Sequence, residues 1–153
     1  KELDELGISC VWTAEAYGYD GAPKMIENAL KNIEGPMFFQ ADLNNWNPNK
    51  KFDIIYSMEV LYYLDSPKKF INECYNKWLN PGGLFIAGID HYKENHQSLS
   101  WSEDLNVIMK TKKIEEWKNV LINSGFNNVG VCQVNQNKDW KGTLVFWGKT
   151  NSL

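Results

Sequence analysis

The chain has 153 residues, which suits one domain, and its 43% hydrophobic and 23% charged residues are typical of a folded globular protein. A formal net charge of −3 without any run of five like charges argues against a nucleic-acid-binding protein, and no apolar run is long enough to span a membrane. The three cysteines lie far apart and form no CxxC pair, so neither structural zinc nor a disulfide framework is expected, and a reducing, cytoplasmic setting fits best.

The first part of the chain is predicted to alternate short strands with a helix. Residues 14–20 are typical of a short strand that ends in an acid, and residues 23–32 of a helix whose first turn accommodates Pro23. A further short strand is expected near residues 38–41, followed by a polar loop. The apolar face expected for the helix consists of Met25, Ile26, Ala29 and Leu30.

Two apolar runs in the middle of the chain predict strands that are buried on both faces. These are residues 52–57 and 84–89. Between them, Ser66 followed by Pro67 indicates the start of a helix, and the Asn-Pro-Gly-Gly sequence at 80–83 ends it. The side chains expected on the inner face of this helix are Phe70, Ile71, Cys74 and Trp78.

The last third begins with a long polar connection, residues 90–110, of a kind that is usually functional or mobile. A helix is expected at 112–124 with Gly125 as its C-cap, and two strands with a short connecting loop, which must be antiparallel, follow. The alternation predicts an α/β fold over residues 1–153 as a single domain, a three-layer αβα sandwich with a mostly parallel sheet and an antiparallel C-terminal hairpin strand.

Four segments resemble class I S-adenosylmethionine-dependent methyltransferases in their order and spacing. They are YGYDGAPKMIENA, FFQADLNNW, FDIIYSMEVLYYLDSPKKFINECYNKWLNPGGLFIAG, and EEWKNVLINSGFNNV with the strand pair after it, and together they cover residues 15–148. The resemblance implies a Rossmann-like fold, S-adenosyl-L-methionine as cofactor, and methyl transfer to a small-molecule amine or hydroxyl acceptor by direct displacement. No metal-ligand spacing is present, and the resemblance implies neither a nucleic-acid nor a membrane partner. The oligomeric state is not predicted.

The resemblance also implies cofactor-binding residues, and ligands of open α/β sheets do bind beyond the carboxyl ends of the strands. Asp20 would accept hydrogen bonds from the ribose hydroxyls, although an acid there also suits a helix N-terminus. Asp42 would accept one from the adenine amino group, although an Asx-turn is the alternative. The backbone after residue 56 would line the methionine part of the cofactor. The full set is Asp20, Gly21, Ala22, Met25, Asp42, Leu43, Ser57, Met58 and Glu59.

The acceptor site is expected around the stretch IDHYKENHQSLSW, residues 89–101. His91 and His96 are candidate bases, because a histidine titrates near neutral pH, and Tyr92 between them is a third catalytic candidate. Solvated loop histidines and core aromatics are the alternatives. Aromatic rings bind cationic ammonium groups well, and the candidate substrate-contacting residues are Tyr62, Tyr63, Trp101 and Trp140.

A glycine-rich loop of the GxGxG type should precede residue 15 in this family, but Gly7 is the sole glycine before Gly18. We therefore expect that N-terminal sequence is missing from the chain or that residues have been closed up near 9–13. The alternatives are a catalytically inactive interaction domain of the same fold and a Rossmann oxidoreductase that binds a nicotinamide dinucleotide. The C-terminal hairpin and the Ala-Asp-Leu sequence at 41–43 favour the methyltransferase over the oxidoreductase.

Overall fold

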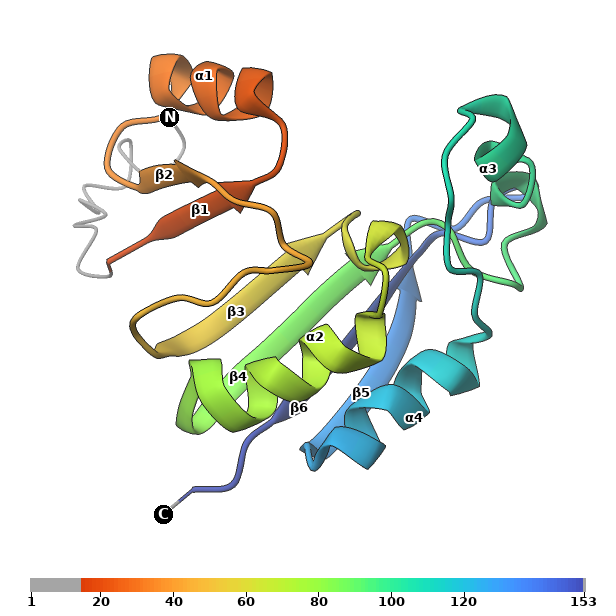
Figure 1. The fold of residues 1–153 in the computed structure, drawn as a ribbon. Coiled ribbons are helices and arrows are strands. Elements are labelled where there is room, and N and C mark those ends of the chain that lie inside the picture. The colour runs from red at the N-terminus through yellow and green to blue at the C-terminus, as the bar shows by residue number, and fades with distance from the viewer. Residues whose placement is uncertain (1–14, 153) are drawn as a thin grey trace, which may run out of the picture. The chain divides into compact units, whose positions relative to one another are not determined.

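The structure is a computed structural model in which residues 15–152 are described (Figure 1). The chain divides into two compact units, of which the first ends at Trp46 and the second begins at Asn47. The elements follow one another in the predicted order. We expected residues to have been closed up near 9–13, where the glycine-rich loop is missing, and these positions lie outside the described residues.

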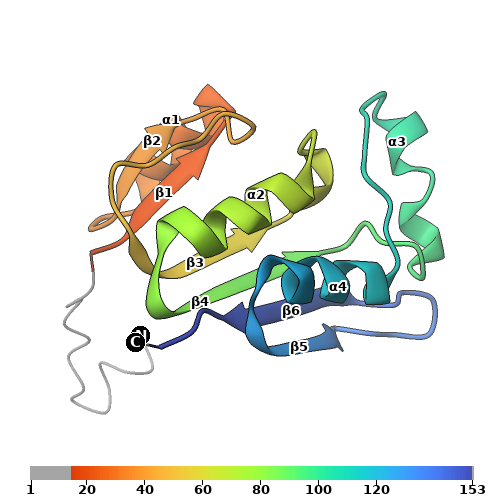
Figure 2. The same ribbon diagram turned by 60° about the horizontal axis from the view of Figure 1, so that its bottom comes forward.

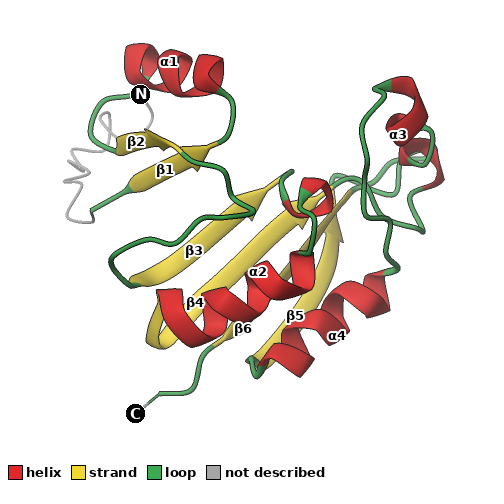
Figure 3. Cartoon of the chain, in the orientation of Figure 1, coloured by secondary structure: helices red, strands yellow, loops and turns green. Residues whose placement is uncertain are grey.

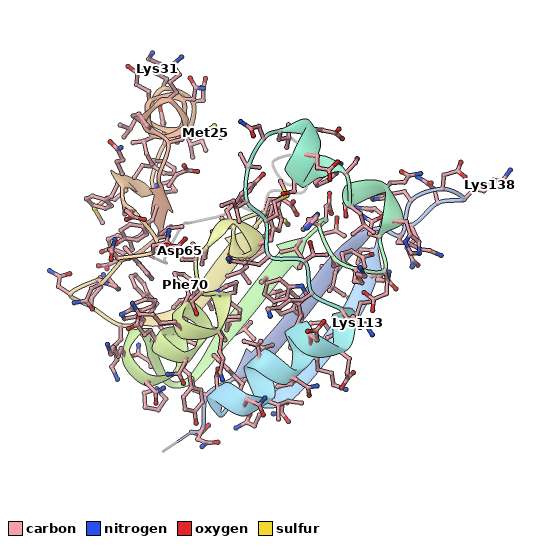
Figure 4. All side chains as sticks on the ribbon, turned by 45° about the vertical axis from the view of Figure 1, so that its right-hand side comes forward. Met25, Lys31, Asp65, Phe70, Lys113 and Lys138 are labelled. Atoms are coloured by element: carbon pink, nitrogen blue, oxygen red, sulfur yellow. The ribbon has the colours of Figure 1, made fainter. Side chains whose placement is uncertain are left out.

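The first unit holds β1 (Tyr17–Asp20), α1 (Pro23–Asn32) and β2 (Met37–Gln40). The two strands pair in parallel, which requires the crossover that α1 provides. The predicted helix bounds are confirmed, but the predicted apolar face is wrong in part. Met25 is 56% and Leu30 is 62% exposed, and Met25 projects from the helix in Figure 4. Two strands offer a narrow surface, so only Ile26 and Ala29 are half-buried.

The second unit is a four-stranded sheet in the order β3-β4-β6-β5. Its strands are β3 (Phe52–Met58), β4 (Leu79–Ile89), β5 (Asn127–Val134) and β6 (Thr143–Lys149). β3 and β4 are parallel, whereas β6 is antiparallel to both of its neighbours. The α/β fold class and the antiparallel C-terminal hairpin are thus confirmed. The Asn-Pro-Gly-Gly sequence does end the preceding helix, and it forms an irregularity in β4 where the pairing register shifts.

Both longer helices of the second unit, α2 (Pro67–Glu73) and α4 (Ile114–Ser124), cover the same face of the sheet (Figures 2 and 3). Ser66 caps α2 by accepting a hydrogen bond from the Lys69 N–H at 3.3 Å, and α2 continues into a π-helical turn, η3 (Cys74–Trp78). Gly125 ends α4 in the left-handed conformation, as predicted. The predicted inner face of α2 and η3 is confirmed, since Phe70, Ile71, Cys74 and Trp78 are all buried.

The other face of this sheet is apolar but open. Ile54 is 61% and Tyr56 is 60% exposed, whereas Ile55 and Ser57 between them are buried against the helices. The prediction that residues 52–57 form a strand buried on both faces is therefore wrong. An apolar run indicates that a strand can be buried, but it does not indicate which elements cover each of its two faces. No helix among the described residues is long and apolar enough to cross a membrane.

Three short helical segments complete the second unit at the carboxyl ends of β3 and β4. These are η2 (Leu61–Tyr63), which follows β3, and η4 (His96–Ser98) and α3 (Trp101–Asp104), which lie in the long connection between β4 and α4. The connection is otherwise irregular, as predicted. Parallel strands bring their carboxyl ends to one edge of the sheet, so this edge gathers the predicted acceptor residues.

Candidate functional site

In the first unit, Asp20 is the last residue of β1, at the carboxyl end of a parallel pair. Its Oδ1 accepts a hydrogen bond from the Ala22 N–H at 2.7 Å, which holds the carboxylate over the start of α1. Among the described residues, no side chain or amide bonds to its Oδ2. One carboxylate oxygen is therefore available to a hydroxyl donor, which is what a ribose would require.

Asp42 follows β2 and is exposed. Its Oδ1 accepts a hydrogen bond from the Asn44 N–H at 3.0 Å and its Oδ2 accepts one from Asn45 Nδ2 at 2.7 Å. The Asx-turn that was the alternative for this residue is thus present. A carboxylate oxygen has two lone pairs, so these bonds leave acceptor capacity for an amino group. Around the two acids, Gly21 and Ala22 are exposed and Leu43 is half-buried.

In the second unit, the end of β3 combines backbone strain with unpartnered polar atoms. Glu59 has a φ of +54°, a left-handed conformation that non-glycine residues seldom adopt, and its N–H donates to the Gly88 carbonyl at 2.9 Å. Ser57 is buried, and its Oγ has no hydrogen-bond partner in the part of the chain that the structure describes. Met58 between them is 44% exposed. Strained residues of this kind concentrate at functional sites, where they hold a backbone in a required shape.

The Glu59 carboxylate is partly buried beside a second acid. Burial raises its pKa above the ordinary value of 4.5, and the nearby Asp90 carboxylate raises it further. The Tyr62 hydroxyl opposes this by donating to Oε2 at 2.6 Å, and the nearby Asp90 backbone N–H also lowers the pKa. Glu59 Oε1 and Asp90 Oδ1 are both buried, and no described residue makes a hydrogen bond to either atom. This edge of the sheet therefore presents acceptor oxygens that no donor within residues 15–152 satisfies.

We expect Glu59→Gln to raise the free energy of unfolding at pH 8, by at most about 1 kcal/mol because the carboxylate is only partly removed from water. Its raised pKa means that the folded protein binds more protons than the unfolded chain between pH 4.5 and the native pKa, so stability is lost as pH rises through that window. Glutamine is neutral throughout, so the gain should vanish below pH 4. Urea titrations at the two pH values measure this, with Glu115→Gln on the exposed surface of α4 as the control. A loss of stability at pH 8 would contradict the expectation.

His91 and Tyr92 are both fully buried. His91 Nδ1 donates to the Ser98 carbonyl at 2.9 Å, because a carbonyl can only accept, and Nε2 lies 2.7 Å from Thr111 Oγ1. The Tyr92 hydroxyl donates to the Gly142 carbonyl at 2.9 Å, and burial raises its pKa. Both side chains hold the connection after β4 in place, and their catalytic role stays a prediction. His96 is exposed in η4.

The structure brings all four predicted substrate-contacting aromatics into one continuous row. The ring centroids of Tyr63 and Tyr62 are 4.4 Å apart, and those of Tyr62 and His91 are 5.5 Å apart. Trp101 stacks on His91 at 6.4 Å and on Trp140 at 6.1 Å. We call these five rings the aromatic row. Tyr63 is 45% exposed and both tryptophans are half-buried, so the row is open to solvent at several points.

Two polar residues at this edge were not predicted as site residues. Asp90 follows β4 directly, just as Asp20 ends β1. An acid at the end of a parallel strand led to the prediction for Asp20, and the same signal could have identified Asp90. Asn95 is fully buried and donates from Nδ2 to the Asp90 carbonyl at 2.8 Å, and its Oδ1 has no partner. Nothing in the sequence indicated that Asn95 would be buried. Among the described residues, no group of three or more His, Cys, Asp or Glu is suited to hold a metal ion.

An α/β fold with acids at the carboxyl ends of its parallel strands defines a class of nucleotide-cofactor-binding domains. Residues 3–87 match the family model described as "Methyltransferase domain", and the chain belongs to this family. The match extends over the first unit and through β3, α2 and most of β4, and it includes every predicted cofactor-binding residue.

The curated relatives are methyltransferases of longer chains. Malonyl-(acyl-carrier protein) O-methyltransferase 1 of Ilyobacter polytropus is 31% identical over an alignment of 104 residues that covers 63% of this chain and 38% of the relative. Trans-aconitate 2-methyltransferase of Escherichia coli is 26% identical over 97 residues, which are 63% of this chain and 35% of the relative. The matched part of the chain thus spans less than two fifths of the length of these relatives.

Solved structures share the fold. The methyltransferase in the Haloferax volcanii complex with the Trm112 activator has a TM-score of 0.77 at 22% identity, over 90% of this chain and 72% of that one. A possible histamine N-methyltransferase of Thermotoga maritima has a TM-score of 0.74 at 18% identity, over 97% and 76%. The N-methyltransferase NodS of Bradyrhizobium japonicum, solved with S-adenosyl-L-homocysteine, has a TM-score of 0.64 at 21% identity, over 89% and 66%. These likenesses support the Rossmann-like fold that the sequence predicted.

Proposed function

We propose that this domain binds S-adenosyl-L-methionine and catalyses transfer of its methyl group to a small-molecule acceptor. The observation that carries the proposal is the Asp20 carboxylate, which lies at the carboxyl end of a parallel strand and keeps one oxygen unengaged, in a chain of the methyltransferase domain family. S-adenosyl-L-homocysteine and S-adenosylmethionine occupy fold neighbours solved as complexes, and this supports the predicted cofactor. The cytoplasmic location expected from the cysteine pattern remains part of the proposal.

The residues of the first unit would hold the adenosine part of the cofactor. Asp20 Oδ2 accepts hydrogen bonds from the ribose, and Asp42 accepts one from the adenine amino group while its Asx-turn keeps the carboxylate oriented. Leu43 adds apolar and backbone contact. The exposed residues at the start of α1 would also contact the adenosine, and these are Gly21, Ala22 and Met25.

By the family resemblance, the residues after β3 would contact the methionine part of the cofactor, and those after β4 the acceptor. The strained backbone of Ser57–Glu59 lines the methionine part, and the unpaired buried oxygens there need donors that a ligand supplies. When bound, the cofactor supplies a methyl group on a sulfonium, which an acceptor takes by direct displacement. The task of the protein is to hold the acceptor atom in line with that methyl group at near-attack distance.

Calorimetric titration of the protein, with all of its native sequence, with S-adenosyl-L-methionine tests the proposal. We expect micromolar binding that Asp20→Ala weakens by at least about tenfold, or 1.4 kcal/mol, because the ribose hydroxyls lose their acceptor. Glu27→Ala, which removes an exposed acid of α1 in the same unit, is the matched control and should leave binding unchanged. If the folded protein binds no S-adenosyl-L-methionine, the proposal is contradicted and the catalytically inactive interaction domain is favoured.

A further inference from the structure

β5 lies at one edge of the sheet in the second unit, and Figure 2 shows it as the outermost strand on that side. Among the described residues β6 is its only strand partner, and no other described backbone group bonds to the backbone of residues 130–134. The N–H and C=O groups of an edge strand that point away from its partner are unpaired, and they offer a template for another strand. The outer edge of β5 is therefore able to accept one.

This edge lacks the features that usually prevent such pairing. Edge strands in natural proteins are protected by charged side chains, by proline or by bulges. The sequence of β5, NNVGVCQV, contains no charged residue and no proline. Its pairing with β6 is irregular between Asn127 and Gly130, and Asn128 has a φ of +49°, so a bulge interrupts only the start of the strand. The regular and unprotected part is residues 130–134.

The two ends of this stretch complement each other on one face of the sheet. Gly130 pairs with Trp147 of β6, and the indole ring lies over it, because a Cβ added to Gly130 would collide with that ring. Trp147 is only half-buried. Val134 lies four residues further on, so its side chain is on the same face, and it is 39% exposed. One end thus offers an uncovered ring beside a residue without a side chain, and the other end offers an apolar side chain.

We infer that two copies of this chain pair antiparallel through β5 about a two-fold axis at Cys132, and that their two sheets thereby join into one. Pairing about this axis sets Cys132 opposite its own copy and Gly130 opposite the partner subunit's Val134. Directly opposite residues of an antiparallel pair share a face of the sheet. Each exposed valine is therefore placed beside the Trp147 ring of the other copy, at both ends of the contact.

A second copy fits this edge because the stretch is self-complementary in charge as well as in shape. In a two-fold contact the residue at the axis meets itself, so a charged residue there would oppose the pairing. Cys132 is exposed and neutral, and its neighbours Val131 and Gln133, which would lie opposite each other, are also uncharged. Five residues on each strand are few for a permanent dimer, so we expect a dissociation constant on the order of 10 μM.

Sedimentation velocity of the full chain, at concentrations on both sides of this value, should show a monomer converting to a dimer. Cys132→Lys and Cys132→Asp should each raise the dissociation constant by at least about tenfold, because like charges then meet at the axis. An equal mixture of these two variants should restore the dimer, because opposite charges meet instead. Ile108→Lys, which adds a charge at a residue that is 80% exposed outside the sheet, should leave the dimer unchanged, and circular dichroism checks that every variant is folded.

Oxidation of the unmodified protein by copper phenanthroline gives a second readout. Directly opposite residues have Cα atoms about 4.5–5.5 Å apart, which a disulfide can bridge. The two Cys132 thiols, each losing a proton and an electron to the oxidant, should therefore link the copies covalently. Cys132→Ser, which keeps Cys10 and Cys74, should not be linked.

Four results would each overturn the inference: a monomer at every concentration, a dimer that survives both charged variants, a mixture of those variants that stays monomeric, or a dimer that Cys132 does not crosslink. The first of these would leave the edge of β5 to a strand from a different protein.

Discussion

Replacement of Trp117 by alanine is expected to lower the free energy of unfolding by about 3–5 kcal/mol, the usual cost of removing a large buried aromatic. The side chain is fully buried on the inner face of α4 and stacks on Phe146 of β6, with ring centroids 5.5 Å apart. The cavity would lie between α4 and the sheet, where rigid neighbours on both sides limit collapse. Urea denaturation followed by circular dichroism measures the loss.

Trp117→Phe separates the contribution of the ring from that of the indole N–H. The Trp117 Nε1 atom is buried and has no hydrogen-bond partner among the described residues, and an unsatisfied donor costs about 1–3 kcal/mol. Phenylalanine keeps a stacking ring and removes this donor, so we expect a loss under about 1.5 kcal/mol despite the smaller volume. Equal losses for the two variants would mean that the indole N–H is satisfied after all and that its bond, rather than packing, is the main contribution.

Gly142→Ala is expected to cost about 2–4 kcal/mol of stability. Gly142 adopts a φ of +83°, where a residue with a side chain pays about 1–2 kcal/mol. A Cβ at this position would also collide with the Val134 backbone carbonyl across the β5–β6 hairpin, and backbone cannot move aside as a side chain does. The Gly142 carbonyl accepts the Tyr92 hydrogen bond as well, so any shift would weaken the anchor of the connection after β4.

Gly82→Ala is the matched control for this prediction. Gly82 lies in the same unit with a φ of +75°, but a Cβ there meets only the Ser152 side-chain oxygen, at 3.4 Å. It should therefore show the conformational cost alone, about 1–2 kcal/mol. Thermal unfolding of both variants compares the two positions. If Gly142→Ala were no more destabilising than Gly82→Ala, the predicted collision would be absent in solution.

The local signals of the sequence were sufficient to predict most elements. Pro23 placed the start of α1, Ser66 the start of α2 and Gly125 the end of α4, and each acts through its own backbone or a neighbour within three residues. Such signals do not depend on the rest of the fold. They therefore survive in a single sequence without knowledge of tertiary contacts.

Burial and contacts between distant residues were less predictable. The alternation of exposed Ile54 and Tyr56 with buried Ile55 depends on which elements cover each face, and all of these residues are apolar or aromatic in the sequence. In the candidate site, the four aromatics were predicted singly. The direct stacking of Trp101 on Trp140 joins positions far apart in the chain, and His91 connects Trp101 to Tyr62. The assignments of Asp20 and Asp42 to a cofactor still rest on the resemblance and stay predictions.

The strand order of the second unit has a consequence for how the protein folds during synthesis. β6 is the last strand of the described chain, yet it lies between β4 and β5 and pairs with both. Until residues 143–149 have left the ribosome, β5 has no partner strand within the unit and β4 carries an open edge on that side. The parallel pair β3–β4 and the helix between them can form earlier, whereas the sheet as a whole closes only in a late step that inserts its last-made strand into its interior.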